Sequence, residues 1–320
     1  MSSILVVGSV ALDSVKTLSG ESHEALGGSA IYFSLAAKQF APVTMVGVVG
    51  EDFPAQHRQM LQDNGINLSG LKAVKGKTFR WVGKFGRDLS AAKTLATHLN
   101  VFASFKPALT DAQRKSPVVF LANIDPELQS EVLAQMKSPA IVACDTMNYW
   151  ITSKPEALKD LLSRVHIFFG NEEEAKRLTK TANAFAAARV IAGWGPSVVV
   201  VKKGEHGALL HAGGRFYALP AYPVETVMDP TGAGDTFAGA FMGYLTSVGH
   251  FRDVESLKRA VAYGATMASF TVEAFSTKRL EDLRRQALDE RFGDYLGLIN
   301  VSREPSRGGK ARPSLAASAK

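Results

Sequence analysis

The sequence predicts an α/β protein with a mostly parallel central sheet that helices cover on both faces. Short, almost wholly apolar runs such as Val118–Ala122 and Ser197–Lys202 are typical of strands buried on both faces. From residue 118 onward such runs alternate with segments of helical character, which is the order expected of parallel βα units. No linker interrupts this alternation, so one domain is expected over residues 1–300.

The first part of the chain should open with a strand and continue in the same alternating manner. Gly27 and Gly28 stand just before an apolar helical segment, and Gly65 ends a later helix. The elements expected here are strand 4–8, helix 30–38, strand 43–49 and helix 55–64.

Residues 71–105 have a different character and predict a small antiparallel β unit. Thr78–Phe85 alternates polar and apolar residues and runs into the turn Gly86–Asp88, and Thr94–Phe105 is again strand-like. Gly70–Thr78 is nearly a phosphate-binding loop of the Walker A type, but it has five residues between its glycines instead of four. We therefore expect a turn into the small sheet at that point.

The second half of the chain supplies the remaining units of the sheet. Its expected elements, in order, are helix 128–136, strand 140–145, helix 154–163, strand 166–169, an acidic helix from 172, helix 182–192, strand 197–202, and the late helices 254–268 and 280–288.

Composition is that of an ordinary globular protein. Of 320 residues, 46% are hydrophobic and 21% are charged, and the one cysteine, Cys144, lies in an apolar run. A buried thiol and a reducing compartment fit this pattern better than a disulfide framework or a nucleophile. The N-terminus has no signal-peptide pattern, and no apolar stretch approaches the length of a spanning helix, so a cytoplasmic protein without a membrane partner is expected.

The net charge of +7 would suit a nucleic-acid partner, but its distribution argues against one. The last twenty residues carry +4 and residues 1–300 only +3. The tail 301–320 is also rich in Ser, Gly, Pro and Ala, so it is expected to be disordered and basic. No specific nucleic-acid partner is predicted.

The run from Asp229 to Phe241 is the most informative stretch of the chain. Gly232, Ala233 and Gly234 come just before a helix rich in small residues, and Asp235 follows them directly. Unpaired N–H groups at a helix start attract anions, and glycines let the backbone come close. A carboxylate beside a bound phosphate suits a reaction in which a hydroxyl loses its proton. Taken alone, the same residues also suit a plain turn with a helix cap.

This thirteen-residue run resembles the C-terminal signature of the ribokinase-like, or PfkB, family of carbohydrate and nucleoside kinases. The resemblance covers about residues 4–290 and implies the ribokinase-like fold. It makes Asp235 the base and Gly232, Ala233 and Gly234 the anion hole. It also implies that ATP donates the phosphoryl group, with Thr231, Gly232 and Gly234 in the ATP site.

Asn171–Glu174 matches a second motif of this family, Asn-x-x-Glu. By resemblance, Asn171 and Glu174 hold Mg²⁺ near the phosphates through water, and Asn171 also contacts ATP. Three adjacent acids at a helix start are equally favoured by the helix dipole alone, so the two readings stay open.

Lys202 and Gly204 follow the buried strand 197–202 and resemble the stretch that borders the nucleotide in this family. The resemblance assigns both to the ATP site. An ordinary turn with solvated basic residues is the alternative.

The substrate side of the site is expected at the N-terminal end. Asp13 follows the first strand, where the family uses an acid to bind sugar hydroxyls, and Gly27 and Gly28 match the first family signature. Ser29 and Tyr32 also fall in the substrate region. They depart from the residues common in ribokinases, so they leave the substrate undecided, and Tyr32 can equally be a core residue.

Together these features predict an ATP- and Mg²⁺-dependent kinase that phosphorylates an alcohol of a sugar or related small molecule. A nucleoside kinase is the nearest alternative, an inactive sugar-binding regulator is another, and a dehydrogenase on a similar sheet is a third. The resemblance also implies a lid built from about 11–25 and 72–105, homodimers paired through that lid, and a monovalent cation such as K⁺ at Asp229.

Overall fold

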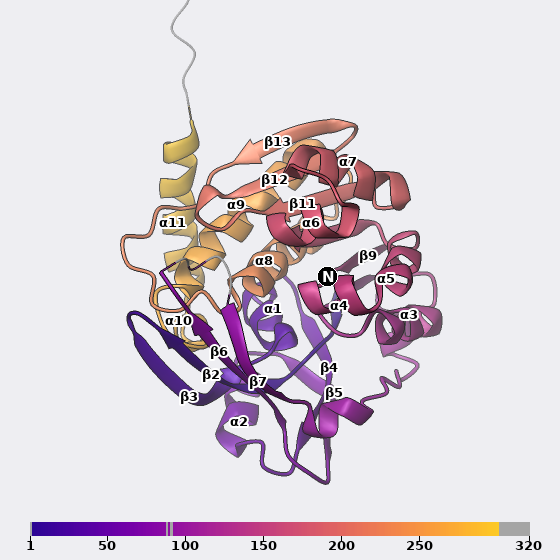
Figure 1. Cartoon of the computed structure of the whole chain (residues 1–320), viewed down its shortest axis with the longest axis vertical. Coiled ribbons are helices and arrows are strands. Elements are labelled where there is room, and N and C mark those ends of the chain that lie inside the picture. The colour runs from indigo at the N-terminus through magenta and orange to yellow at the C-terminus, as the bar shows by residue number, and fades with distance from the viewer. Residues whose placement is uncertain (1, 88, 90–91, 301–320) are drawn as a thin grey trace, which may run out of the picture.

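The computed structural model describes residues 2–87, 89 and 92–300 and contains a nine-stranded sheet (Figure 1). From β5 to β11 the neighbouring strands are parallel, and β12 and β13 extend the sheet as an antiparallel hairpin. In spatial order the strands are β13 (Arg215–Leu219), β12 (Ala208–Ala212), β11 (Val198–Lys202), β10 (Ile167–Asn171), β9 (Ile141–Cys144), β8 (Val118–Leu121), β1 (Ile4–Val7), β4 (Val43–Gly50) and β5 (Asn67–Val74).

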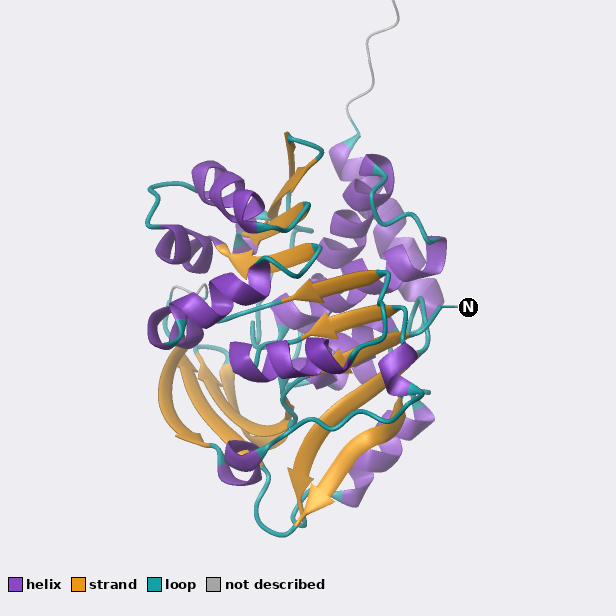
Figure 2. Cartoon of the chain, turned by 90° about the vertical axis from the view of Figure 1, so that its right-hand side faces the viewer, coloured by secondary structure: helices purple, strands orange, loops and turns teal. Residues whose placement is uncertain are grey.

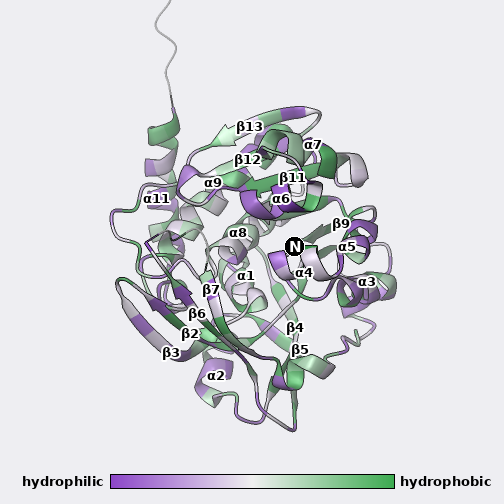
Figure 3. Cartoon of the chain, viewed as in Figure 1, coloured by the Kyte–Doolittle hydropathy of each residue, from purple (hydrophilic) through white to green (hydrophobic). Residues whose placement is uncertain are grey.

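Helices cover both faces of this sheet because its strands are apolar on both sides (Figures 2 and 3). On β1, Ile4 and Val6 enter one core while Leu5 and Val7 enter the other. The first core is completed by α1 (Ser29–Ala37), α2 (Ala55–Asp63), α8 (Ala233–Val248), α9 (Val254–Thr271), α10 (Lys278–Glu281) and α11 (Arg285–Ile299). The second is completed by α3 (Pro126–Gln135), α4 (Asn148–Ser153), α5 (Pro155–Leu162), α6 (Glu172–Thr179) and α7 (Ala184–Trp194). The predicted fold class is confirmed.

A second, four-stranded sheet stands beside the first. Its spatial order is β3 (Gly20–Gly27), β2 (Ala11–Thr17), β6 (Phe79–Phe85) and β7 (Ala92–His98). The neighbours β2 and β6 are parallel, whereas the two outer pairs are antiparallel. Hydrogen bonds from Thr17 Oγ1 to Met228 O (2.8 Å) and from Ser276 Oγ to Leu26 O (2.6 Å) tie this small sheet to the main body.

Within the segment 72–105, which was expected to belong to the small sheet, only β6 and β7 do so. Residues 72–74 are the end of β5, which pairs with β4 in the large sheet, so the near-Walker stretch begins in a strand and not in a turn. Residues 100–104 form a short 3₁₀ helix instead of continuing a strand. The expected helix 280–288 is in fact two, α10 and α11, separated near Leu283.

Three further expectations concern the chain as a whole. Cys144 is fully buried, and burial followed by the charge of Asp145 raises the pKa of its thiol, as a core cysteine requires. None of the helices within the described ranges is long and apolar enough to cross a membrane. The tail 301–320 and Asp88 of the expected turn lie outside the described residues.

Candidate active site

The loop before α8 (Pro230–Gly232) leads into a helix start whose backbone N–H groups could receive an anion. Gly232 is the residue before the helix and adopts a left-handed conformation (φ 77°), which a glycine tolerates well. The N–H of Ala233 donates to Pro230 O (3.2 Å), and Thr236 N–H makes the first helical bond, to Gly232 O (2.8 Å). The N–H groups of Gly234 and Asp235, in the first turn, have no helical acceptor by position and carry the positive end of the helix dipole.

Asp235 sits in that first turn with a partly accessible side chain. Burial, with the charge of Asp145 next, raises the pKa of its carboxyl to about 7, and the ammonium of Lys202 opposes this rise. A carboxyl that titrates near neutrality is suited to take a proton from a hydroxyl. A carboxyl suited to accept a proton and N–H groups suited to an anion therefore share one helix start.

Lys202 supplies a positive charge to the same place. It ends β11, and its Nζ would lie only 2.9 Å from a Cβ added at Gly234. Burial alone would lower the pKa of Lys202, but the neighbouring carboxylates Asp145, Glu174 and Asp235 together raise it. The ammonium is therefore protonated beside the anion-binding loop.

Asn171 and Glu174 form a capping box at the start of α6. Asn171 Oδ1 accepts from Glu174 N (2.8 Å), and Glu174 Oε2 accepts from Asn171 N (2.7 Å). Burial, with the charge of Asp145 next, raises the pKa of Glu174 to about 7. The motif thus has a structural role, and its carboxylate still lies close enough to Asp235 for their charges to interact.

These residues fit a hydrated Mg²⁺ better than a directly bound one. Within the described ranges, no three His, Cys, Asp or Glu side chains are grouped closely enough to hold a metal ion. Mg²⁺ commonly keeps several waters and takes one or two carboxylates together with substrate phosphates. The oxygens of Glu174 and Asp235 are of the hard, anionic type that such a hydrated ion prefers.

Asp13 is brought to the same region by the small sheet. It lies on β2 with an 8% exposed side chain, and burial, followed by the charge of Asp229, raises its pKa to about 7. Gly28 N–H donates to its carboxylate. A Cβ at Gly27 would lie 1.9 Å from Asp13 Oδ2, so this glycine is required for the carboxylate to occupy its place.

The other predicted substrate residues face inward. Ser29 exchanges hydrogen bonds with Ser9, hydroxyl to hydroxyl at 3.0 Å and from its N–H to Ser9 Oγ at 3.0 Å. Tyr32 is only 2% exposed and packs against Gly232. Both side chains therefore make contacts within the protein, and the hydroxyl of Ser29 is already hydrogen-bonded to Ser9.

Three predicted residues remain, Asp229, Thr231 and Gly204. Asp229 is buried, and its two oxygens accept from Thr231 N (2.9 Å) and Ser276 N (3.3 Å). Thr231 Oγ1 is buried without a hydrogen-bond partner among the described residues. Gly204, with φ 56°, begins the turn after β11, and a Cβ there would meet no atom within 4 Å. The backbone at Gly204 is thus open to approach.

One buried residue of the site was missed from the sequence. Asp145 follows β9 directly, and its carboxylate is 2.7 Å from Lys202 Nζ. The signal existed, because Asp145 stands after an apolar strand just as Asn171 does. No pattern in the sequence indicated that Asp145 would pair with a lysine 57 residues later.

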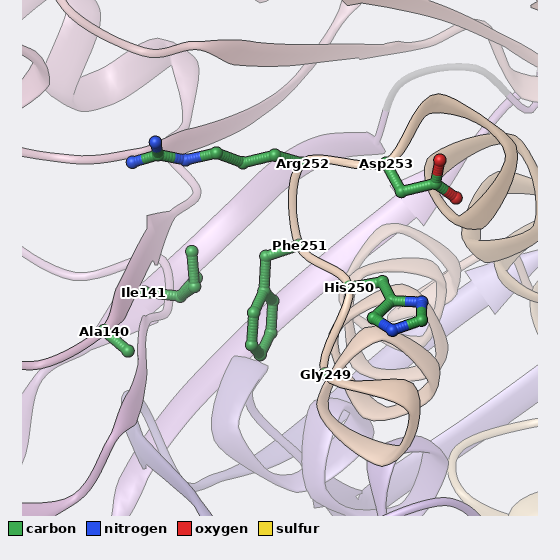
Figure 4. A pocket seen from close by; sticks show the side chains of 7 residues that line it. All are labelled: Ala140, Ile141, Gly249, His250, Phe251, Arg252 and Asp253. Atoms are coloured by element: carbon green, nitrogen blue, oxygen red, sulfur yellow. The ribbon is translucent and has the colours of Figure 1, made fainter.

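A separate cavity of about 650 Å³ lies at the opposite edge of the large sheet (Figure 4). It is lined by Ala140, Ile141 and residues 249–253, at the beginning of β9 and the end of α8. Its one carboxylate, Asp253, accepts from Ser256 N (2.8 Å) and caps α9. The chemistry described above therefore belongs to the other edge, where ligands of open parallel sheets bind.

Known proteins resemble the chain in sequence and in fold. A cytidine kinase of Thermococcus kodakarensis is 32% identical over 254 residues, which are 76% of this chain and 89% of that protein. The nucleoside kinase of Methanocaldococcus jannaschii, an archaeal member of the ribokinase family, superposes with a TM-score of 0.73 at 21% identity, covering 92% and 99% of the two chains. The ribokinase of Arabidopsis thaliana, solved with ribose and ATP, also gives a TM-score of 0.73 at 21% identity, over 91% and 99%.

The sequence pattern of the pfkB family carbohydrate kinases matches residues 1–282. This range includes the large sheet, the small sheet, and the loop with Asp235. The expected family and fold are confirmed by it. The chain belongs to the pfkB family of carbohydrate kinases, phosphotransferases that use an alcohol group as acceptor.

Proposed function

We propose that this chain transfers the γ-phosphoryl group of ATP to an alcohol of a nucleoside, with Asp235 as the base. The observation that carries the proposal is the meeting of three groups at the start of α8: the anion-binding N–H groups, the Asp235 carboxyl with its pKa near 7, and the Lys202 ammonium. Phosphoryl transfer requires mainly positioning and charge stabilisation, which these groups supply.

In the proposed reaction the hydroxyl oxygen of the acceptor attacks the γ-phosphorus of ATP. Its proton passes to Asp235, and the bond between the γ-phosphorus and the bridging oxygen breaks to release ADP. The N–H groups of Gly232 and Gly234 and the Lys202 ammonium stabilise the charge on the transferring group. The N–H of Ala233, also expected in the anion hole, already donates to Pro230 O. Asn171 and Glu174 would hold the water shell of a bound Mg²⁺, which would neutralise phosphate charge.

The acceptor would lie between Asp13 and Asp235. The buried Asp13 carboxylate can accept hydrogen bonds from two neighbouring hydroxyls, as on a ribose ring. The ATP triphosphate would approach from the side of Lys202 and Gly204. The small sheet, which carries Asp13, would then act as a lid that excludes water from the reaction.

A nucleoside is favoured over a free sugar because the cytidine kinase relative covers most of both chains. A free sugar is the second candidate, since the family as a whole is named for carbohydrate kinases. The test is ATP consumption with cytidine, uridine, adenosine, inosine, ribose and hexoses. The proposed acceptor class is wrong if the wild-type protein turns over only sugars, and the proposed reaction is wrong if it turns over none of these while binding them.

A monovalent cation at Asp229 is a further proposal. Both oxygens of Asp229 already accept backbone N–H groups, from Thr231 and Ser276. A cation would therefore have to use further oxygens of this loop. Comparing rates in K⁺, Na⁺ and a bulky organic cation tests it, and equal rates would exclude the site.

A further inference from the structure

A buried ion pair crosses the carboxyl edge of the large sheet between Asp145 and Lys202. Asp145 follows β9 and Lys202 ends β11, and these strands flank β10 in the sheet. The distance from Lys202 Nζ to Asp145 Oδ2 is 2.7 Å, and the side chains are 16% and 4% exposed. Neither charge is therefore well solvated, so each depends on the other.

The Asp145 carboxylate is fixed before any ligand arrives. Its second oxygen, Oδ1, accepts from Thr146 N (2.8 Å). Its carbonyl accepts from Gln129 Nε2 (3.0 Å), a 1% exposed amide that also binds Leu121 O (3.1 Å) and so joins the ends of β8 and β9. The oxygen that faces Lys202 is thus held by a rigid, buried network.

The lysine end of the pair points to the anion-binding loop. A Cβ at Gly234 would lie 2.9 Å from Lys202 Nζ and 3.6 Å from its Cε, so the ammonium rests against the first turn of α8. A terminal phosphate bound at that turn would contact the same ammonium.

We infer that Asp145 is a positioning residue for phosphoryl transfer: it holds the Lys202 ammonium beside Gly234, where the terminal phosphate of ATP would bind. This inference rests on the proposed function. A purely structural pair is the alternative, but replacing a buried ion pair by apolar residues is often neutral or stabilising. A contribution to folding stability therefore does not by itself explain why two charged side chains are buried here.

The experiment is a double-mutant cycle measured as kcat and as the KM for ATP and for the acceptor. Lys202→Met should lower kcat about 100-fold, as loss of one transition-state donor does elsewhere. Asp145→Asn should lower it about 10-fold or more, because the ammonium loses its anchor. The double variant should be no slower than Lys202→Met alone, within about twofold. Lys203→Met is the matched control, because the Nζ of this neighbouring lysine pairs instead with Glu172 Oε2 (3.7 Å), and it should keep wild-type kcat.

Binding gives a second readout that does not need turnover. Asp145→Asn should weaken binding of ATP about 10-fold while leaving AMP binding unchanged, since only the terminal phosphates reach Lys202. Each variant is first checked for a single cooperative thermal unfolding transition. If Asp145→Asn does not fold, the activity of the double variant, which leaves no unpaired charge, provides the test.

The inference is overturned if Asp145→Asn keeps wild-type kcat and ATP affinity. It is equally overturned if the Asp145 change costs as much in the Lys202→Met background as in the wild type, or if the folded double variant is as active as the wild type. A wild-type protein that neither binds ATP nor transfers phosphate would instead refute the proposed function itself, and this inference with it.

Discussion

The ring of Tyr32 lies directly beneath Gly232: a Cβ added to this glycine would come within 2.4 Å of three ring atoms. Tyr32 belongs to α1 and Gly232 begins α8, so the contact fixes the anion-binding loop to a neighbouring helix. The backbone of Gly232 also has a positive φ of 77°. Glycine is thus required here twice, by conformation and by space.

Gly232→Ala should therefore abolish most activity and lower stability. The left-handed conformation costs a non-glycine residue about 1–2 kcal/mol, and overpacking against the Tyr32 ring adds about 1–3 kcal/mol. Gly249→Ala is the matched control, because Gly249 ends the same helix with φ 73° and has nothing within 4 Å of an added Cβ. The unfolding temperature and kcat should both fall further in Gly232→Ala than in Gly249→Ala. Equal losses of stability in the two variants would show that the Tyr32 ring does not restrict position 232.

Asp235→Asn should separate activity from stability. Losing the base should lower kcat by at least about 10²–10⁴-fold, with a small change in the KM for ATP. Because burial disfavours the charged carboxylate, the amide should unfold at a higher temperature than the wild type at pH 8, and the difference should shrink as pH falls towards 4. The kinetic prediction fails if kcat is retained, and the electrostatic account fails if Asn lowers the unfolding temperature at pH 8.

The pH dependence should follow the raised pKa values of Asp13 and Asp235, both about 7. A folded-state pKa above the unfolded value means that the native protein binds the proton more tightly. These groups therefore add stability as pH falls from about 8 towards 4, and that contribution is lost as pH rises through 7. Catalysis has the opposite sense, because Asp235 must be deprotonated: kcat/KM should fall below about pH 7. Measuring both profiles in one buffer series tests the sign, and a kcat/KM that stays flat down to pH 5 would contradict it.

How much of this site the sequence could predict depends on the range of the interactions. Asp235, Gly232 and Gly234 lie together at one helix start, so their local order was enough to predict them as a site. The capping box of Asn171 and Glu174 is local as well, three residues apart. Local patterns were also enough for the buried strands, whose apolar character does not depend on their partners.

Long-range pairings were beyond the sequence. The pairing of Asp145 with Lys202, and the parallel pairing of β2 with β6, join segments that are more than fifty residues apart. The inward role of Ser29 depends on Ser9, which only the turn after β1 brings near. Patterns of hydropathy say which face is buried, but they do not name the partner across it.

Glu174→Gln should tell a metal role from a structural one. Glutamine can take the same place in a capping box, so the stability of α6 should be kept. If Glu174 also orders the waters of Mg²⁺, removing its charge should raise the Mg²⁺ concentration for half-maximal rate about tenfold or more. Glu173→Gln is the control, since Glu173 is an exposed neighbour that pairs with Lys176 on the same helix. An unchanged Mg²⁺ requirement in Glu174→Gln would leave the capping box as the whole role of the motif.

Gly27→Ala should act on the acceptor and not on ATP. The new methyl group would occupy the position of Asp13 Oδ2, 1.9 Å away, and force the carboxylate to move. If Asp13 binds acceptor hydroxyls, both Gly27→Ala and Asp13→Asn should raise the acceptor KM by about tenfold or more, the range of a lost charge-assisted hydrogen bond. The KM for ATP should stay within about twofold, because Lys202 and the loop at Gly232 are unaltered. Gly65→Ala, at a positive φ of 72° with free space around it, controls for strain elsewhere in the chain. A rise in the ATP KM alone, in either variant, would place Asp13 on the nucleotide side and contradict the acceptor assignment.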